Sequence, residues 1–198
     1  MFKAFAILSF LIFFSVPAFS AEPPVDISSL KTKAAQGDAS AQVTLGNIYE
    51  RGEGVTEDYI EAEKWYRKAA DQGNVWGQLD LAILYKGAIA YDSGLGVKQD
   101  DAESAKWYRK AADQGQVNGQ YEIGKMYAEG KGVAQSYADA YLWYSLAISS
   151  PEYAALCTDV SKERAAIAAK MTPEQIEKEK RLVSEWKPVP AAAAAPPK

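Results

Sequence analysis

The chain of 198 residues contains no histidine and a single cysteine, Cys157. Without histidine it lacks the side chain that most often acts as a general base near neutral pH, and with it the usual catalytic triads and most zinc sites. A lone cysteine excludes an internal disulfide. We interpret Cys157 as a small buried residue, because free cysteine is among the most buried residue types; the alternative is a disulfide to a partner protein.

The chain also lacks a strong excess of charge and a long apolar segment after its first twenty residues. Its 26 acidic residues outnumber 22 basic ones, which gives a formal net charge of −4. A mildly acidic protein does not attract nucleic acid or anionic lipid through its overall field, so neither is an expected partner. We expect no membrane insertion once the first segment is removed.

The first twenty residues have the pattern of a secretory signal. Lys3 precedes the apolar run Ala4–Val16, Pro17 ends that run, and Ala18–Ser20 offers small residues to a signal peptidase. We predict cleavage near Ser20 and a periplasmic or secreted location. An uncleaved membrane anchor is the alternative, but the run is short for a bilayer span and has no basic stop-transfer flank.

Three segments of the chain repeat one another, over residues 37–72, 73–114 and 115–150. Each carries a tyrosine, a Gly-x-Gly-Val and a Trp-Tyr pair in the same order. A fixed period of this size predicts a solenoid, in which each unit buries its apolar face only against its neighbours. The middle unit is longer by six residues, inserted between Tyr85 and Gly96. The equivalent aromatic residues are Tyr49, Tyr85 and Tyr127, and Trp65, Trp107 and Trp143.

Each repeat is expected to hold two helices. Apolar residues at offsets of three and four predict first helices over residues 39–50, 75–86 and 117–129. Glycines inside two of these helices are unfavourable in isolation and therefore predict close approach of a neighbouring helix, with no side chain in between. These glycines are Gly46 and Gly124.

The second helix of each repeat is expected to begin at a capping residue, either Asp58, Asp100 or Ser136. Glutamates three residues later predict capping boxes in the first two of these helices. The same two helices are expected to end at glycines suited to a left-handed cap. The glutamates are Glu61 and Glu103, and the glycines are Gly73 and Gly115.

The ends of the stack are expected to be closed by further helices. Residues 21–36 resemble the end of a second helix and are predicted to form an N-terminal capping helix. Residues 151–187 are predicted to form two C-terminal capping helices, the last of which opens with the cap, proline and glutamine of residues 172–175. Residues 188–198 are rich in proline and alanine and predict a disordered tail.

The repeat reads Ala-x-x-x-Leu-Gly-x-x-Tyr-x-x-Gly-x-Gly-Val-x-x-Asp-x-x-x-Ala-x-x-Trp-Tyr-x-x-Ala-Ala-x-x-Gly from Ala41 to Gly73. This pattern resembles the Sel-one-like repeat (SLR), a relative of the tetratricopeptide repeat. Further copies fit at residues 77–115 and 119–150, although Ala147–Ser150 departs from the pattern. The resemblance implies an all-α, right-handed α/α superhelical solenoid that acts as an adaptor for protein complexes. Bacterial members are often exported and take part in envelope or host-contact processes, and the family has no shared catalytic motif.

Catalysis and cofactor binding are not expected. One cysteine-rich branch of the SLR family is associated with β-lactams, but its paired cysteines are missing here. The Ser-x-x-Lys of Ser28–Lys31 has the spacing of an acyl-enzyme nucleophile, yet it lacks the companion motifs, and an exposed capping helix explains it better. Metal binding by Asp100 and Asp101 is conceivable, but a helix cap explains Asp100 more simply.

Positions that differ between aligned repeats are free of packing constraints and are therefore candidates for partner binding. On the first helices they form stripes that point away from the packing face, and the middle repeat offers an aromatic, a carboxylate and an aliphatic residue. The inserted loop adds two apolar residues; the alternatives are that this loop is a tolerated insertion and that Trp76 packs against the first repeat. The predicted partner-binding residues are Trp76, Asp80, Ile83, Tyr91, Ile89, Asn47, Thr44, Glu122 and Lys125.

Three functions follow as hypotheses. The first is an exported scaffold that binds a protein or peptide through its concave surface. The second is a binder or modulator of peptidoglycan or of cell-wall enzymes, with Trp76 stacking on a sugar ring. The third is a weak β-lactamase-like hydrolase that uses Ser28.

Overall fold

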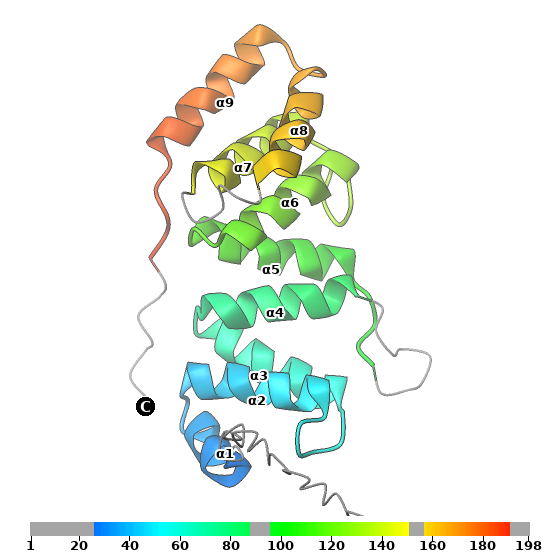
Figure 1. The fold of residues 1–198 in the computed structure, drawn as a ribbon, viewed down its shortest axis with the longest axis vertical. Coiled ribbons are helices and arrows are strands. Elements are labelled where there is room, and N and C mark those ends of the chain that lie inside the picture. The colour runs from blue at the N-terminus through cyan, green and yellow to red at the C-terminus, as the bar shows by residue number, and fades with distance from the viewer. Residues whose placement is uncertain (1–25, 88–95, 151–156, 191–198) are drawn as a thin grey trace, which may run out of the picture.

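The computed structural model describes residues 26–87, 96–150 and 157–190. Within these ranges the chain is helical and contains no strand, which confirms the all-α prediction. Helices follow one another as a vertical stack (Figure 1). In chain order they are α1 (Ile27–Ala35), α2 (Ala39–Arg51), α3 (Tyr59–Asp71), α4 (Val75–Lys86), α5 (Asp101–Asp113), α6 (Val117–Glu129), α7 (Tyr137–Ser149), α8 (Cys157–Ala168) and α9 (Pro173–Glu185).

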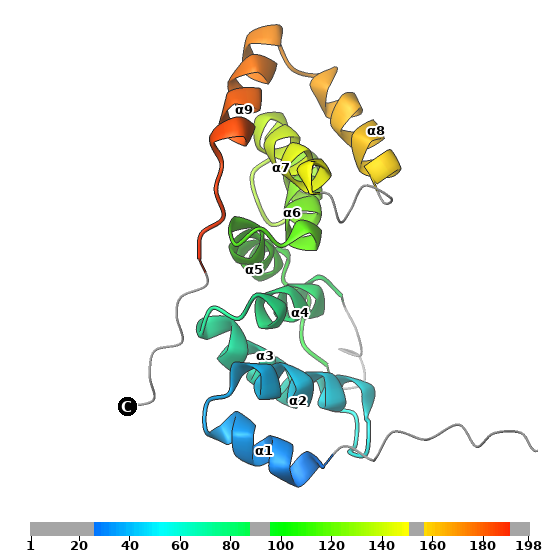
Figure 2. The ribbon, with the colours of Figure 1, turned by 60° about the vertical axis from the view of Figure 1, so that its left-hand side comes forward.

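The three repeats are the helix pairs α2–α3, α4–α5 and α6–α7. Each first helix packs against its own second helix, and each second helix packs against the first helix of the next repeat. Figures 1 and 2 show the pairs following one another along the long axis of the molecule. This is the α/α solenoid that the period predicts. The bounds of the first helices agree with the sequence prediction to within one residue.

The second helices begin at the predicted caps, whose side chains accept backbone N–H groups of the first turn. The predicted capping boxes, however, are wrong. The backbone N–H of each cap residue donates instead to the carbonyl oxygen of that repeat's tyrosine, at 2.9–3.0 Å. Glu61 and Glu103 are therefore not needed at the cap, and their carboxylates pair with Lys64 and Lys106. The three bonds run from Asp58 to Tyr49, from Asp100 to Tyr85 and from Ser136 to Tyr127.

The equivalent tryptophans occupy equivalent positions, each with a cation over its ring. Trp107 and Trp143 are almost fully buried in the main core. Trp65 is only partly buried and packs against a smaller cluster to which α1 contributes Ala34. The cations are Lys68 over Trp65 at 3.9 Å, Lys110 over Trp107 at 4.0 Å and Arg109 over Trp143 at 4.8 Å from the ring centroids.

Buried glutamines link consecutive repeats, a feature that the sequence reasoning missed. Each donates its side-chain amide to a carbonyl oxygen at the end of the preceding helix. A second glutamine then donates to the side-chain oxygen of the first, at 2.7 Å in both cases. Satisfying the buried amides in this way fixes the register of the stack. The first set pairs Gln42 with Ala34, Gln78 with Ala70 and Gln120 with Ala112; the second pairs Gln72 with Gln42 and Gln114 with Gln78.

The helical glycines face a neighbouring helix, as predicted, but the prediction that no side chain lies in between is wrong. A Cβ atom at Gly46 would overlap the ring of Tyr66, and one at Gly124 would lie 2.9 Å from Cδ1 of Tyr144. The neighbour is therefore a buried tyrosine ring of the paired second helix. The absence of a side chain at the glycine makes room for that ring.

Helices α8 and α9 both pack against α7, the second helix of the third repeat. Ile167 of α8 joins a buried cluster with Tyr141 and Tyr144 of α7. The predicted capping box between Thr172 and Gln175 forms at the start of α9. Residues 151–156, where the first capping helix was predicted to begin, and the side chain of Cys157 lie outside the described part of the chain.

The segment after α9 returns along the stack (Figure 1). Trp186 packs against the main core, and the backbone N–H of Val189 donates to the carbonyl oxygen of Asp113 at 2.7 Å. Residues 188–190, predicted as the start of a free tail, are thus attached to the fold; residues 191–198 lie outside the described residues. None of the helices that the structure describes is long and apolar enough to cross a membrane.

Candidate partner-binding face

The first helices α2, α4 and α6, together with α8, form one side of the stack, which we call the first-helix face. Two predicted partner-binding residues stand out on it because they are large, apolar and exposed. Trp76 is 56% exposed and Ile83 is 44% exposed, both on α4. Ile89 and Tyr91, also predicted, lie outside the described residues.

A cleft of about 400 Å³ opens beside Ile83. Its walls come from α4, α6 and α8, and the buried ring of Tyr108 contributes to its lining. Tyr121 lies at the same cleft and donates its hydroxyl to Glu163 of α8 at 3.1 Å. Burial, followed by the charge of Glu163, raises the pKa of Tyr121 to about 12. The cleft thus offers an apolar lining with carboxylates at its edge.

Glu122 lines the cleft and is ion-paired. Its carboxylate accepts from Nζ of Lys86 on α4 at 2.5 Å, an ion pair that joins the second and third repeats. Lys125 lies next to this pair and lines a smaller pocket of about 160 Å³. The structure therefore brings Ile83, Glu122 and Lys125 to neighbouring parts of one surface.

Asp80 is a half-buried carboxylate on α4, between the turns that carry Trp76 and Ile83. Burial raises its pKa to about 6; the negative charge of Glu50 on α2 adds to this effect, and Arg51 opposes it. Glu50 itself accepts a hydrogen bond from the hydroxyl of Tyr66. The α2–α4 junction thus places two carboxylates near each other.

The two remaining predicted residues are tied into local structure. Asn47 accepts a hydrogen bond from the hydroxyl of Tyr66 at 2.7 Å, and the hydroxyl of Thr44 donates to the carbonyl oxygen of Ser40 at 2.9 Å. Thr44 remains exposed on the first-helix face. Both residues lie on α2.

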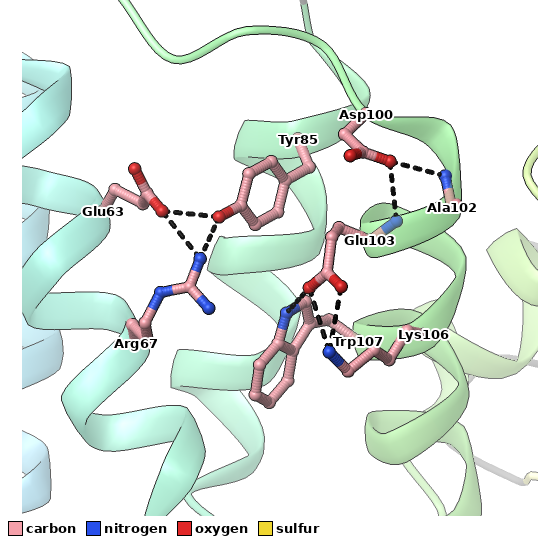
Figure 3. A network of polar contacts seen from close by, with 8 residues as sticks. All are labelled: Glu63, Arg67, Tyr85, Asp100, Ala102, Glu103, Lys106 and Trp107. Carbon is pink, nitrogen blue, oxygen red and sulfur yellow. Dashed lines mark hydrogen bonds and ion pairs between the residues drawn. The ribbon is translucent and has the colours of Figure 1, made fainter.

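Charged residues of the second helices serve to join repeats (Figure 3). Glu63 and Arg67 of α3 form an ion pair at 2.7 Å, and both reach the hydroxyl of Tyr85 on α4. Burial, then the hydrogen bond to Glu63, raises the pKa of Tyr85. In the next helix, Glu103 accepts from the indole N–H of Trp107 at 3.2 Å. These carboxylates therefore have structural partners.

The residues considered for chemistry also have structural partners. Asp100 caps α5, as expected, and no group of three potential metal ligands occurs in the described ranges. Nζ of Lys31 lies 5.6 Å from the ring centroid of Tyr49. Ser28 is exposed, and its backbone N–H donates to the cap residue Asp26.

Sequence reasoning missed three residues of this face: Glu50, Tyr108 and Tyr121. Tyr108 belongs to the repeated Trp-Tyr pair, and Tyr121 aligns with the apolar residues Val43 and Leu79, so nothing in the sequence marked either tyrosine as lining a cleft. Glu50 had a signal, because it aligns with Lys86 in the next repeat and so reverses a charge at an equivalent position.

Comparison with known proteins agrees with this architecture. The family model "Sel1 repeat" matches residues 39–74, 77–116 and 117–150. A Sel1 repeat protein from Oxalobacter formigenes, known from its crystal structure, is 34% identical. That match covers 62% of this chain and 48% of the other, with a TM-score of 0.55. No curated protein matches the chain.

A second solved structure is c5321, a protective antigen of uropathogenic Escherichia coli with an SLR fold. It is 25% identical over 79% of this chain and 47% of its own length, with a TM-score of 0.41. The chain thus spans about half the length of each solved relative. The three matched repeats cover more than half of the chain and coincide with the helix pairs of the structure. The chain therefore belongs to the Sel1 repeat family, whose members generally mediate protein–protein interaction.

Proposed function

We propose that the chain is an exported scaffold that holds a protein or peptide against its first-helix face. The exposure of Trp76 and Ile83 beside the cleft carries this proposal. Large apolar side chains that stay in water on a rigid support are typical of binding hot spots, and solenoid curvature commonly creates an extended concave binding surface. Because the stack is already ordered, binding there requires little further ordering of the protein.

Site-specific photo-crosslinking in the native cells tests this proposal. We expect a photoreactive residue at Trp76 or Ile83 to give the same discrete adduct, whose protein component mass spectrometry identifies. Matched controls carry the photoreactive residue at Ile60 or Leu182, which are also exposed apolar residues but lie on the second-helix α3 and on α9. Adducts that form only at the control positions would contradict the proposed binding face.

The proposed location is the periplasm or the exterior of a bacterial cell, with a role in envelope or host-contact processes. The signal-like pattern of residues 1–20 supports export, and the Sel1 repeat protein of Oxalobacter formigenes is bacterial. N-terminal sequencing of the protein from a periplasmic extract is expected to give a chain that begins near Ala21. Recovery of the protein with Met1 and its apolar run intact would refute export by cleavage.

Binding of cell-wall material is a second candidate, supported by the exposed ring of Trp76, which suits stacking on a sugar. Sedimentation with purified peptidoglycan separates the two candidates. The protein-scaffold proposal predicts that the chain stays in the supernatant, whereas co-sedimentation that Trp76→Ala abolishes would favour the cell-wall candidate. We expect no catalysis, so a labelled penicillin should leave Ser28 unmodified.

A further inference from the structure

The internal repeat supplies a direct comparison between two junctions of the first-helix face. Glu50 of the first repeat aligns with Lys86 of the second, and Asp80 of the second repeat aligns with Glu122 of the third. The α4–α6 junction therefore holds the ion pair Lys86–Glu122, at 2.5 Å. At the equivalent place, the α2–α4 junction holds two carboxylates, Glu50 and Asp80.

No hydrogen bond or ion pair in the described ranges joins Asp80 to a cation. The charge of Arg51 acts on Asp80, but the guanidinium of Arg51 forms its ion pair with Glu53, at 3.4 Å. Two like charges placed together, with one of them partly desolvated, are unfavourable unless a cation joins them.

The surroundings of the two carboxylates fit a cationic side chain. Trp76 is exposed and lies one helical turn before Asp80, on the same face of α4. An aromatic face next to a carboxylate suits lysine or arginine, which gain both an ion pair and a cation–π contact. Ile83, one turn further along, leads to the apolar cleft.

We propose that the α2–α4 junction, formed by Glu50, Asp80 and Trp76, binds a lysine or arginine side chain of the partner, while a neighbouring apolar side chain enters the cleft beside Ile83. This inference rests on the proposed binding of a protein or peptide to the first-helix face. The ammonium or guanidinium group of the partner takes the place that the ammonium group of Lys86 has at the α4–α6 junction. The match of charge selects a basic, apolar peptide segment as the occupant.

Selection from a displayed library of random peptides tests the proposal on the purified, processed chain. We expect the enriched peptides to share a lysine or arginine close to an apolar residue. The best peptide is then synthesised and labelled, and its affinity is measured by fluorescence anisotropy. We expect Asp80→Asn to weaken peptide binding about fivefold or more. Glu50→Lys should weaken it about tenfold or more, because the ammonium group introduced at position 50 occupies the place of the peptide's cation.

Three comparisons make the outcome decisive. Glu185→Lys makes the same change of charge at an exposed position on α9 and should leave the affinity within about twofold. Acetylation of the peptide's lysine, or replacement of its arginine by citrulline, should weaken binding to the natural chain but not to Glu50→Lys. Circular dichroism checks that each variant retains its helices.

The possible failures are distinguishable. If the selected peptides bind, lose affinity with Ile83→Asp, and yet show neither a basic residue nor sensitivity at positions 50 and 80, the cation site is wrong and the proposed function stands. If the library yields no peptide that binds the first-helix face, the proposed function itself is refuted. Concentration-dependent self-association that Glu50→Lys abolishes would identify a second copy as the occupant and overturn the peptide assignment.

Discussion

The two junctions between neighbouring first helices use equivalent positions with opposite charge arrangements. Between α4 and α6, Lys86 and Glu122 form an ion pair that the fold supplies from its own residues. Between α2 and α4, Glu50 and Asp80 place two acids together, and burial with the charge of Glu50 raises the pKa of Asp80 to about 6. One junction is electrostatically complete, and the other favours a cation from outside. The repeat therefore conserves the packing of its helices but not the charge of its surface.

We expect the largest loss of stability when a buried glutamine that links two repeats is replaced. Gln78→Leu removes the donor to the carbonyl oxygen of Ala70 and the acceptor for the amide of Gln114. The amide of half-buried Gln114 then loses its acceptor, and the carbonyl oxygen of Ala70 keeps only the backbone N–H of Gly73 as a donor. We therefore expect the free energy of unfolding to fall by about 2 kcal/mol, measured by urea denaturation. Gln36→Leu, at an exposed position, is the control and should change it by less than about 0.5 kcal/mol. Equal effects would show that the links do not hold the register.

The tyrosine that bridges repeats offers a second internal comparison. Tyr85→Phe removes a hydroxyl that meets both Glu63 and Arg67, whereas Tyr127→Phe removes one with a single weak donor, Arg109, at 3.4 Å. We expect a loss of about 1–2 kcal/mol for the first variant and less than about 0.5 kcal/mol for the second, because hydrogen bonds to charged groups contribute more. Thermal and urea unfolding measure both. A larger loss at Tyr127 would contradict the stabilising role of the contacts of Tyr85 with Glu63 and Arg67 in Figure 3.

Lys86→Glu converts the complete junction into a copy of the incomplete one. It breaks the ion pair with Glu122 and places two acids together, so we expect a loss of about 1 kcal/mol at low ionic strength. The loss should shrink in about 1 M salt, because mobile ions screen the repulsion. Lys98→Glu, at an exposed position, is the control for the change of net charge. A loss that does not depend on salt would mean that packing, not charge, dominates at Lys86.

The smallest expected effect is a gain in stability, from replacing Asp80. The folded-state pKa of Asp80, about 6, exceeds its ordinary value of 3.8, so the folded chain binds this proton more tightly than the unfolded chain does. The ionised carboxylate therefore costs stability, and this cost develops as the pH rises from about 4 to 6. Asp80→Asn removes it, and we expect a gain of roughly 0.5–1 kcal/mol near neutral pH, after allowance for solvent screening of a half-buried group.

Melting temperatures of Asp80→Asn and the natural chain across this pH range provide the measurement. Glu50, Arg51 and Tyr66 are the titratable or charged groups that act on Asp80 or are acted on by it, so they are left unchanged in both proteins. The two curves should approach each other near pH 4, separate as the pH rises to about 6, and stay apart by a constant amount above it. Curves that stay parallel throughout would contradict the raised pKa of Asp80.

The fold was largely predictable because the packing residues repeat. Offsets of three and four located the first helices, and the caps Asp58, Asp100 and Ser136 located the second ones. The capping boxes failed for a tertiary reason: the carbonyl oxygen of Tyr49, on the paired helix, takes the N–H of Asp58 that Glu61 would have accepted. Contacts between helices of this kind are not visible in a local motif.

The candidate site was only partly predictable. Alignment of the repeats singled out Trp76 and Ile83 as free of packing, and both are exposed. It could not show that Tyr66 donates a hydrogen bond to Asn47, or that the charge of Glu50 acts on Asp80 across the α2–α4 junction, because both depend on how far one helix is shifted along the next. The repeat alignment predicts which side of a helix is exposed, but it does not predict how far the neighbouring helix is shifted along it.

The most direct test of the central claim is a structure of the chain bound to a selected basic peptide. We expect a lysine or arginine nitrogen of the peptide within hydrogen-bonding distance of the Asp80 and Glu50 carboxylates, with an apolar side chain of the peptide in the cleft beside Ile83. A peptide bound to the second helices α3, α5 and α7 would contradict this expectation. So would a peptide that crosses the first-helix face without placing a cation at the α2–α4 junction.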